Sequence, residues 1–223
     1  MKISVLQFPG TNCEYDTKYA FEQLGCVVEI IWHKEINIPE DTDLLVIPGG
    51  FSYGDYLRSG AIARFATIME SVQAYAAKGG KVLGICNGFQ ILLEAGLLPG
   101  AMKRNDSLHF ISKYHTLKVI NNDNTFLSLL KKDEVLNIPV AHHDGNYFID
   151  DKGLKELEQN GQILLKYCDK DGNLTNMNGS VSNIAGICNK EKNVFGLMPH
   201  PERAIEELLG STDGINMLKG FLQ

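Results

Sequence analysis

The sequence contains 223 residues, of which 44% are hydrophobic and 22% are charged, and its formal net charge is −6. This composition and length are typical of a soluble globular protein, and we expect one domain over residues 1–223. The acidic balance and the lack of a basic run argue against nucleic acid as a partner. No stretch approaches the ~18 consecutive apolar residues of a membrane helix, so we expect no membrane contact.

The cysteines and the first residues of the chain both indicate the cellular compartment in which the protein is expected. The apolar start ends at Pro9-Gly10, which makes it too short for a signal peptide. The cysteines are odd in number, scattered and without C-x-x-C spacing: Cys13, Cys26, Cys86, Cys168 and Cys188. We therefore expect free thiols and a cytoplasmic location.

Strand and helix patterns alternate through the first half of the chain. Apolar runs predict strands over 3–8, 26–32, 44–47 and 81–85. Helical spacing predicts helices over 16–24, 61–78 and 89–95. This order is that of a mostly parallel sheet with helices on both faces, a flavodoxin-like α/β fold.

The second half is less regular. We expect a strand or an extended hairpin over 108–120, strands over 137–141, 163–167, 180–188 and 194–198, and helices over 154–160 and 214–222. Because tight turns join the later strands, part of the C-terminal half is predicted to be antiparallel. No repeat or linker divides the chain.

One sharp turn, Gly84-Ile85-Cys86-Asn87-Gly88, joins the strand at 81–85 to the next helix. G-x-C-x-G is the nucleophile-elbow pattern with sulfur in place of oxygen, and its small residues allow the tight turn. The turn places the Cys86 thiol at a helix N-terminus, where the helix dipole favours the thiolate. We expect this thiol on the surface of the turn; the alternative is a buried structural cysteine.

A glycine pair, Gly49-Gly50, follows the third predicted strand. Paired glycines let the backbone approach a ligand and leave N–H groups free. The N–H groups of Gly50 and of Asn87, directly after the nucleophile, are expected to stabilise an oxyanion. The alternative is a flexible surface loop. Neither G-x-G-x-x-G nor G-x-x-x-x-G-K-[ST] occurs, so no nucleotide cradle is predicted.

His200 and Glu202 follow the last predicted strand, in Pro199-His200-Pro201-Glu202. The prolines hold His200 in an extended segment, and Glu202 is placed to fix its tautomer and stabilise its protonated form. A lone histidine at a strand end is more often a surface or core residue. Together with Cys86, however, this pair predicts a Cys-His-Glu triad whose members all lie at strand ends.

Two other stretches have residue types that bind metals. Residues 169–173, Asp-Lys-Asp-Gly-Asn, lack the full calcium-loop pattern and are expected to form a hairpin turn. His142 and His143 are neighbours on an extended segment, where successive side chains point to opposite faces. We predict no metal site.

Three motifs, P-G-G-F-S-Y-G-D, G-I-C-N-G-F-Q and M-P-H-P-E-R, resemble those of the class I glutamine amidotransferases. Segments 8–13, 57–61 and 209–214 narrow the resemblance to the glutaminase subunits of phosphoribosylformylglycinamidine synthases, in their small stand-alone form. The resemblance spans nearly the whole chain and implies that family's fold. One departure is His142-His143-Asp144-Gly145, where the family usually has His-Gly-Glu-Gly.

The resemblance implies a function in purine biosynthesis. The chain would hydrolyse glutamine through a thioester on Cys86 and pass ammonia to a separate synthetase subunit. That subunit would use ATP and magnesium to convert formylglycinamide ribonucleotide to its amidine, with a small third subunit in the complex and no cofactor in this chain. Gly49, Phe51, Gln90 and His142 are candidate contacts for glutamine.

Two alternatives belong to other functional classes. A thiol hydrolase or DJ-1-like protein shares an elbow cysteine on a similar sheet but lacks the His-Pro-Glu after the last strand. A non-catalytic binding subunit would use the elbow only as structure, and its Cys86 would react with alkylating agents no faster than the other cysteines.

Overall fold

The computed structural model describes residues 1–223, and a nine-stranded sheet forms the centre of the molecule. Its strands are β1 (Lys2–Gln7), β2 (Val27–Trp32), β3 (Leu44–Ile47), β4 (Lys81–Ile85), β6 (Ile111–Val119), β7 (Val135–His142), β9 (Ile163–Cys168), β10 (Ile184–Cys188) and β11 (Val194–Leu197). Their order across the sheet is β2-β1-β3-β4-β11-β10-β9-β6-β7. A separate two-stranded sheet pairs β5 (Ala101–Lys103) with β8 (Asn146–Phe148).

The large sheet has a parallel half and an antiparallel half. Strands β2, β1, β3, β4 and β11 run parallel to one another, so their carboxyl ends lie along one edge. From β11 onward, β10, β9, β6 and β7 each run antiparallel to the neighbouring strand. The predicted fold class, a mostly parallel sheet with an antiparallel portion in the C-terminal half, is confirmed.

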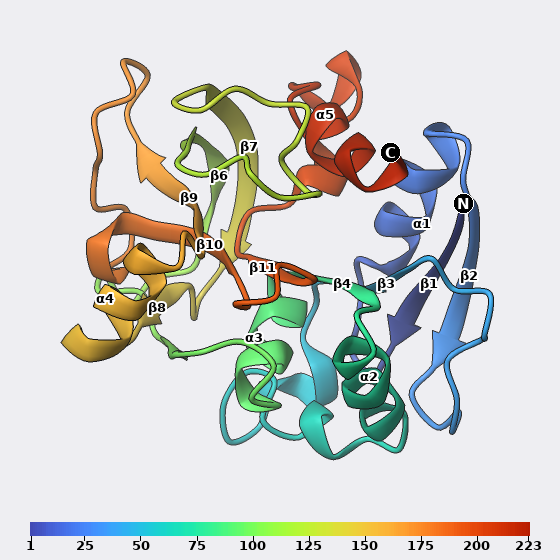
Figure 1. The fold of residues 1–223 in the computed structure, drawn as a ribbon. Helices are drawn as coiled ribbons and strands as arrows, with labels where there is room; N and C mark the ends of the chain where they lie inside the picture. Colours follow the sequence, from blue (N-terminus) through green and yellow to red (C-terminus); the bar gives the residue numbers. More distant parts are fainter.

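Helices cover both faces of the parallel half. The α-helices are α1 (Glu14–Gln23), α2 (Ile68–Ala77), α3 (Asn87–Glu94), α4 (Asp151–Gln159) and α5 (Gly214–Lys219). In Figure 1, α1 and α5 lie on one side of the sheet and α2 and α3 on the other. Short 3₁₀ helices complete the fold: η1 (Ser52–Asp55), η2 (Ala63–Phe65), η3 (Val181–Asn183), η4 (Pro201–Arg203), η5 (Glu207–Leu209) and η6 (Gly220–Leu222). None of the helices has the length and apolarity that crossing a membrane requires.

Two of the predicted elements are shorter in the structure. The helix expected over 61–78 is two helices, η2 and α2, separated by extended backbone at Ala66. Two short helices in succession space their apolar residues almost as one long helix would, which is why the pattern predicted a single helix. That pattern predicted Phe65 to be buried, but Phe65 is 74% exposed. The strand expected over 180–188 begins only at Ile184, because Ser182 and Asn183 have left-handed backbone.

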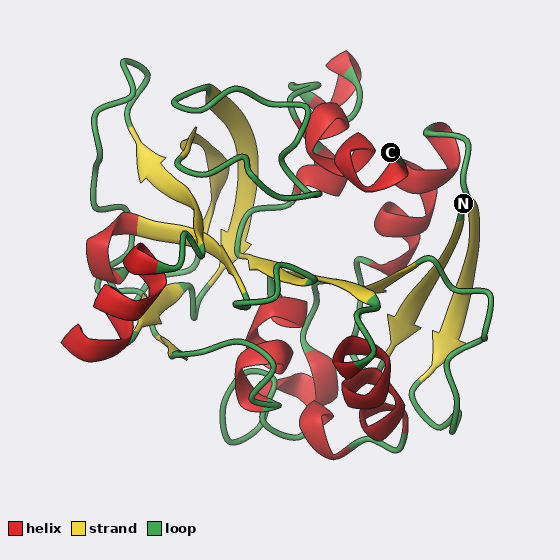
Figure 2. Cartoon of the chain, in the orientation of Figure 1, coloured by secondary structure: helices red, strands yellow, loops and turns green.

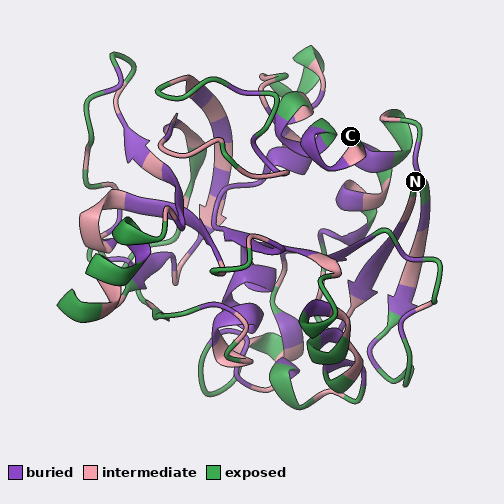
Figure 3. Cartoon of the chain, in the orientation of Figure 1, coloured by how far each residue is buried: buried purple, intermediate pink, exposed green.

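Buried hydrophobic side chains form one continuous cluster through both halves of the sheet. All four residues of β3 are buried, and so are the last four of β4, as expected for parallel strands covered on both faces. Figure 2 shows the strands at the centre with helices and loops around them. Figure 3, in the same orientation, shows that the central strands are mostly buried and that exposed residues lie mainly on the outer helices and loops. The rigid centre therefore fixes the strand ends, where the candidate site lies.

Candidate active site

The segments with the predicted chemistry meet at the carboxyl edge of the parallel half. Gly49 follows β3, Cys86 follows β4 and His200 follows β11, and these three strands are neighbours in the sheet. Sites of open α/β sheets lie beyond the carboxyl ends of parallel strands. The strand pairing thus brings together residues that are more than 100 positions apart in the sequence.

The turn at Cys86 has the backbone of a nucleophile elbow. Cys86 has φ 50° and ψ −105°, a conformation that few non-glycine residues adopt and that is commonest at functional sites. Its N–H donates to the carbonyl of Leu197 at 2.8 Å, and α3 begins at the next residue. A Cβ at Gly88 would lie 1.8 Å from the carbonyl oxygen of Ile47. The second glycine of the pattern is therefore required by packing of α3 against β3.

The Cys86 thiol is buried, which corrects the expectation that it lies on the surface of the turn. The residue is 5% exposed and belongs to the hydrophobic cluster, with Ala141 of β7 and Gly49 of the glycine loop beside it. The thiol donates to the carbonyl of Ala141 at 3.6 Å. It lines a cavity of about 140 Å³, together with Asn12, Cys13, Gly50, Phe51, Phe110, Ala141, His200 and Arg203.

His200 and Glu202 form a buried pair beside this cavity. Their Nδ1 and Oε1 atoms are 2.6 Å apart, and both side chains are inaccessible. Burial disfavours the imidazolium, but the Glu202 carboxylate and the Cys86 sulfur outweigh it and hold the pKa of His200 well above its usual value. The backbone N–H of His200 donates to the carbonyl of Pro139 at 2.8 Å, which fixes the segment against β7. Nε2 of His200 has no hydrogen-bond partner, so this nitrogen can exchange a proton with a substrate.

Cys13 is a site residue that the sequence patterns did not single out. Its Sγ lies within 4.8 Å of a ring nitrogen of His200 and a carboxylate oxygen of Glu202. Burial raises the pKa of this thiol. Nη2 of Arg203 donates to its sulfur at 3.1 Å, and Nε of Arg203 bonds to Asp16 at 2.9 Å. The available signal was segment 8–13, which resembles the family and ends at Cys13, directly before α1.

The backbone of the glycine loop, Gly49-Gly50, packs tightly against its neighbours in the site. A Cβ at Gly49 would lie 2.8 Å from Cε1 of His200 and 3.1 Å from Sγ of Cys13. Gly50 has φ 140°, and a Cβ there would lie 2.6 Å from the backbone nitrogen of Asn12. Both positions therefore exclude any side chain, as expected for backbone that must approach a ligand.

The four predicted glutamine contacts fall into two groups. Gly49 lies beside His200 with no room for a Cβ between them, and Phe51, which is 45% exposed, lines the cavity with Cys86. Gln90 and His142 lie away from the cavity lining. Nε2 of Gln90 donates to the carbonyl of Asp144 at 2.6 Å, and Nδ1 of His142 bonds to Asn105 at 3.1 Å. Burial lowers the pKa of His142 to about 4, so this imidazole is neutral at physiological pH.

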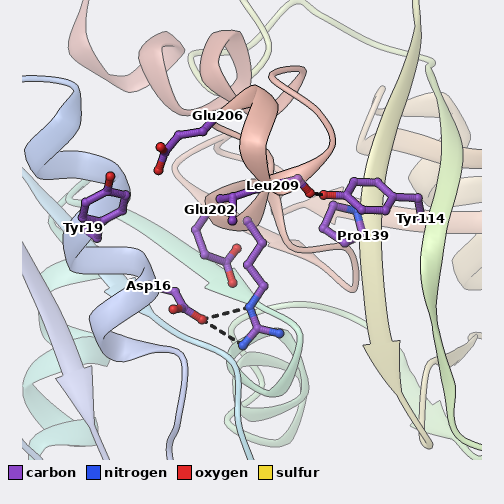
Figure 4. A pocket seen from close by; sticks show the side chains of 8 residues that line it. Asp16, Tyr19, Tyr114, Pro139, Glu202, Glu206 and Leu209 are labelled. Carbon is purple, nitrogen blue, oxygen red and sulfur yellow. Dashed lines mark hydrogen bonds and ion pairs between the residues drawn. The ribbon is translucent and has the colours of Figure 1, made fainter.

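A second pocket, of about 410 Å³, lies behind Glu202. Figure 4 shows Asp16 and Tyr19 on one side of it, Tyr114 and Pro139 on the other, and Glu202 and Glu206 between them. Oε2 of Glu202 is buried and has no hydrogen-bond partner. Glu202 lines this second pocket, His200 lines the first, and Arg203 lines both.

Comparisons with known proteins identify the family to which the chain belongs. Residues 1–214 match the family model of the CobB/CobQ-like glutamine amidotransferase domain. The chain is 69% identical to phosphoribosylformylglycinamidine synthase subunit PurQ of Sulfurimonas denitrificans, with 100% of both chains covered. It is 63% identical to the PurQ subunit of Wolinella succinogenes, over 99% of each chain.

A solved structure extends the likeness to three dimensions. A chain in the structure of PurLQS from Thermotoga maritima is 41% identical, with a TM-score of 0.90, and the match covers 99% of this chain and 97% of that one. The family model, the full-length relatives and the solved structure all indicate the same family. The chain belongs to the glutamine amidotransferases and, within them, to the family of the phosphoribosylformylglycinamidine synthase subunit PurQ.

Proposed function

We propose that this chain is the glutaminase subunit of a phosphoribosylformylglycinamidine synthase, which supplies ammonia to a synthetase subunit during purine biosynthesis. The observation that carries the proposal is that Cys86 and His200 line one small cavity, with Glu202 bonded to Nδ1 of His200. The full-length identity to PurQ subunits supports the pathway. We further propose that residues 1–223 act as one domain in the cytoplasm.

The first half-reaction forms a thioester on Cys86. The thiolate attacks the side-chain amide carbon of glutamine, and the carbonyl oxygen becomes an oxyanion. Protonated His200 then gives its proton to the amide nitrogen, the carbon–nitrogen bond breaks and ammonia departs. The raised pKa of His200 supports this order, because the imidazolium is present before the attack.

The second half-reaction releases glutamate. His200, now neutral, takes a proton from water as the water oxygen attacks the thioester carbon. The carbon–sulfur bond breaks, the Cys86 thiolate is restored, and the imidazolium returns. Glu202 stabilises that imidazolium in both halves through its bond to Nδ1.

The oxyanion is assigned to the backbone N–H groups of Gly50 and Asn87. Asn87 is the first residue of α3, where N–H groups have no acceptor inside the helix. Gly50 lines the cavity opposite the nucleophile. Of the glutamine contacts, we retain Gly49 and Phe51 as direct ones, and we assign Gln90 and His142 to holding the 142–145 segment in place.

Ammonia made here has to be used by another subunit. We infer a synthetase partner that binds ATP and magnesium and aminates formylglycinamide ribonucleotide, with a small third subunit in the same assembly. The related chain from Thermotoga maritima belongs to a structure named PurLQS, which supports such an assembly. No nucleic acid or membrane is part of this function.

The test is transfer of the amide nitrogen. The chain is combined with its synthetase partners, ATP, magnesium, formylglycinamide ribonucleotide and glutamine labelled with ¹⁵N in the side-chain amide. We expect labelled amidine product and one glutamate for each product molecule. Glutamate release without labelled product would point to a simple hydrolase, and no glutamate release at all would support a thiol hydrolase or a binding subunit.

A further inference from the structure

The side chain of Asn87 is buried, with 1% exposure, and it makes a hydrogen bond through every polar group it has. Its Oδ1 accepts from the backbone N–H of Ser52 at 3.0 Å. Its Nδ2 donates to Oδ1 of Asp55 at 3.2 Å and to Oε1 of Gln90 at 2.8 Å. The amide therefore makes all its hydrogen bonds to protein groups, and Asn87 is not among the residues that line the cavity.

These bonds join the helix that follows the nucleophile to the loop that follows the glycine pair. That loop is strained: Tyr53, Asp55 and Leu57 are non-glycine residues with left-handed backbone, with φ of 53°, 53° and 70°. Such conformations persist only where the surroundings impose them. Asn87 holds the loop at two points, Ser52 and Asp55, on either side of the first strained residue.

The same network continues to a third segment. Nε2 of Gln90 donates to the carbonyl of Asp144 at 2.6 Å, and Oγ of Ser59 donates to the Asp144 carboxylate at 2.9 Å. Burial raises the pKa of Asp55 to about 6, and the nearby charge of Asp144 adds to the effect. At neutral pH Asp55 is mainly a carboxylate, which is the form that accepts the bond from Asn87.

We propose that the Asn87 side chain is a positioning residue for the oxyanion hole, because it fixes the loop that bears Gly50 against the start of α3. The proposal rests on the glutaminase function above. The two assigned donors are the N–H of Asn87 itself and the N–H of Gly50, two residues before Ser52. The side-chain amide thus links the two segments that bear these donors, and preorganised donors stabilise an oxyanion only while their spacing holds.

The decisive variants reverse one hydrogen bond in two steps. Asn87→Asp places a carboxylate opposite Asp55, so the donor is lost and two negative groups face each other. Asp55→Asn alone keeps an oxygen that accepts from Asn87. The double variant restores a donor–acceptor pair with the roles exchanged, since the amide now on residue 55 donates to the carboxylate on residue 87. Asn87→Ala removes all three bonds and keeps the backbone N–H.

Each variant is assayed in the complex with the synthetase subunits, with kcat and KM for glutamine and the alkylation rate of Cys86 by iodoacetamide measured separately. Alkylation reports the thiolate and forms no oxyanion. Asn193→Ala is the matched control, because Asn193 is also a buried asparagine with two bonds to carbonyls, at 2.8 and 2.9 Å, but lies outside the site.

We expect Asn87→Ala and Asn87→Asp to lower kcat at least ~10-fold, part of the ~10²–10³ that loss of an oxyanion donor costs. KM and the alkylation rate should stay within about threefold, and Asp55→Asn should resemble the parent. The double variant should recover only part of kcat, because the bond from residue 87 to Gln90 stays broken. Asn193→Ala should lower the melting temperature and leave kcat unchanged.

Three results would overturn the proposal. The first is a normal kcat in Asn87→Ala, and the second is a loss of Cys86 alkylation in parallel with kcat, which would place the defect in the elbow. The third is a double variant that folds but is no better than Asn87→Asp. If Asn87→Ala does not fold, the double variant decides. A parent complex that releases no glutamate is a separate outcome, which removes the glutaminase function itself.

Discussion

The two halves of the central sheet contribute different things to the site. In the parallel half, each strand from β3 to β11 ends in a functional candidate: Gly49, Cys86 and His200. Strands of the antiparallel half end in Cys168, Cys188 and His142, none of which has a step in the proposed reaction. This half instead supplies carbonyls that hold the site residues, with Pro139 accepting from the N–H of His200 and Ala141 from the thiol of Cys86. Parallel order collects strand ends at one edge, whereas antiparallel order divides them between two edges, so only the former can assemble a triad from successive strand ends.

The largest effect is expected when two buried cysteines, one from each half of the sheet, are replaced and compared. Cys86→Ala should reduce glutamine hydrolysis by at least ~10⁴-fold, the scale for loss of a triad nucleophile. The reaction of the assembled complex with ammonium salt in place of glutamine should survive, because amination belongs to the partner. Steady-state assays with both nitrogen sources measure this, and loss of the ammonium reaction in a correctly assembled complex would contradict it.

Cys188 is the matched control in the antiparallel half. It is buried in β10, and burial raises the pKa of its thiol to about 11, so it is unreactive at neutral pH. Cys188→Ala should cost about 1–2 kcal/mol of stability and leave glutaminase activity unchanged. A large loss of kcat in this variant would show that the antiparallel half does more than support the site.

The next test separates the base from its carboxylate. His200→Ala should be nearly as damaging as Cys86→Ala, whereas Glu202→Gln should be ~10–100-fold milder, since triad carboxylates contribute less than the base. The neutral amide still reaches Nδ1 but no longer stabilises the imidazolium. The measurement is kcat of each single variant. Parent-like activity of Glu202→Gln would remove Glu202 from the triad.

A smaller effect is expected from the partner. We predict that the isolated chain is a poor glutaminase and that the synthetase subunits raise its activity by up to ~10²-fold, the scale of one oxyanion donor. The strained loop after Gly50 is the candidate for completion on docking, since such segments often complete a site only when closed. Glutamate release is measured with and without the partners and their substrate. An isolated chain at full activity would show that the loop is already set.

The smallest effect is on stability as a function of pH. The folded-state pKa of His200 lies above its unfolded value of ~6.5, so the bond to Glu202 stabilises the fold fully below pH ~6.5. This contribution is lost as the pH rises through the folded pKa. The stability of the parent over Glu202→Gln should therefore be greatest in mild acid and shrink in alkali, as measured by denaturant unfolding. A difference that grows with pH would reverse the assigned charge states.

Much of the site could be predicted because its parts are neighbours in the sequence. Cys86 lies within a five-residue turn pattern, and His200 and Glu202 are two residues apart, so short motifs contain the chemistry. Cys13 could not be found this way, because its contact with His200 depends on how β1 and β11 are placed in the sheet. The burial of Cys86 was missed for the same reason, since Ala141 comes from the antiparallel half.

The fold was predictable to a similar extent. Apolar runs of buried strands located β1 to β4 well, whereas spacing alone could not tell one helix over 61–78 from η2 and α2 in succession. The small β5–β8 sheet was not predicted, because each of its strands has only three residues. Likewise, the inward bonds of Gln90 and His142 depend on Asp144 and Asn105, which no local pattern connects to them.

The tight contact at Gly88 has a consequence for how this sequence can change over evolutionary time. A Cβ there would overlap the last carbonyl of β3, so even alanine would have to push α3 and the elbow away from the strand. Position 88 takes part in no chemical step, yet a saturation scan should find it as intolerant as Cys86. Two different constraints thus act on this turn: Cys86 must be reactive, and Gly88 must leave space for the carbonyl of Ile47.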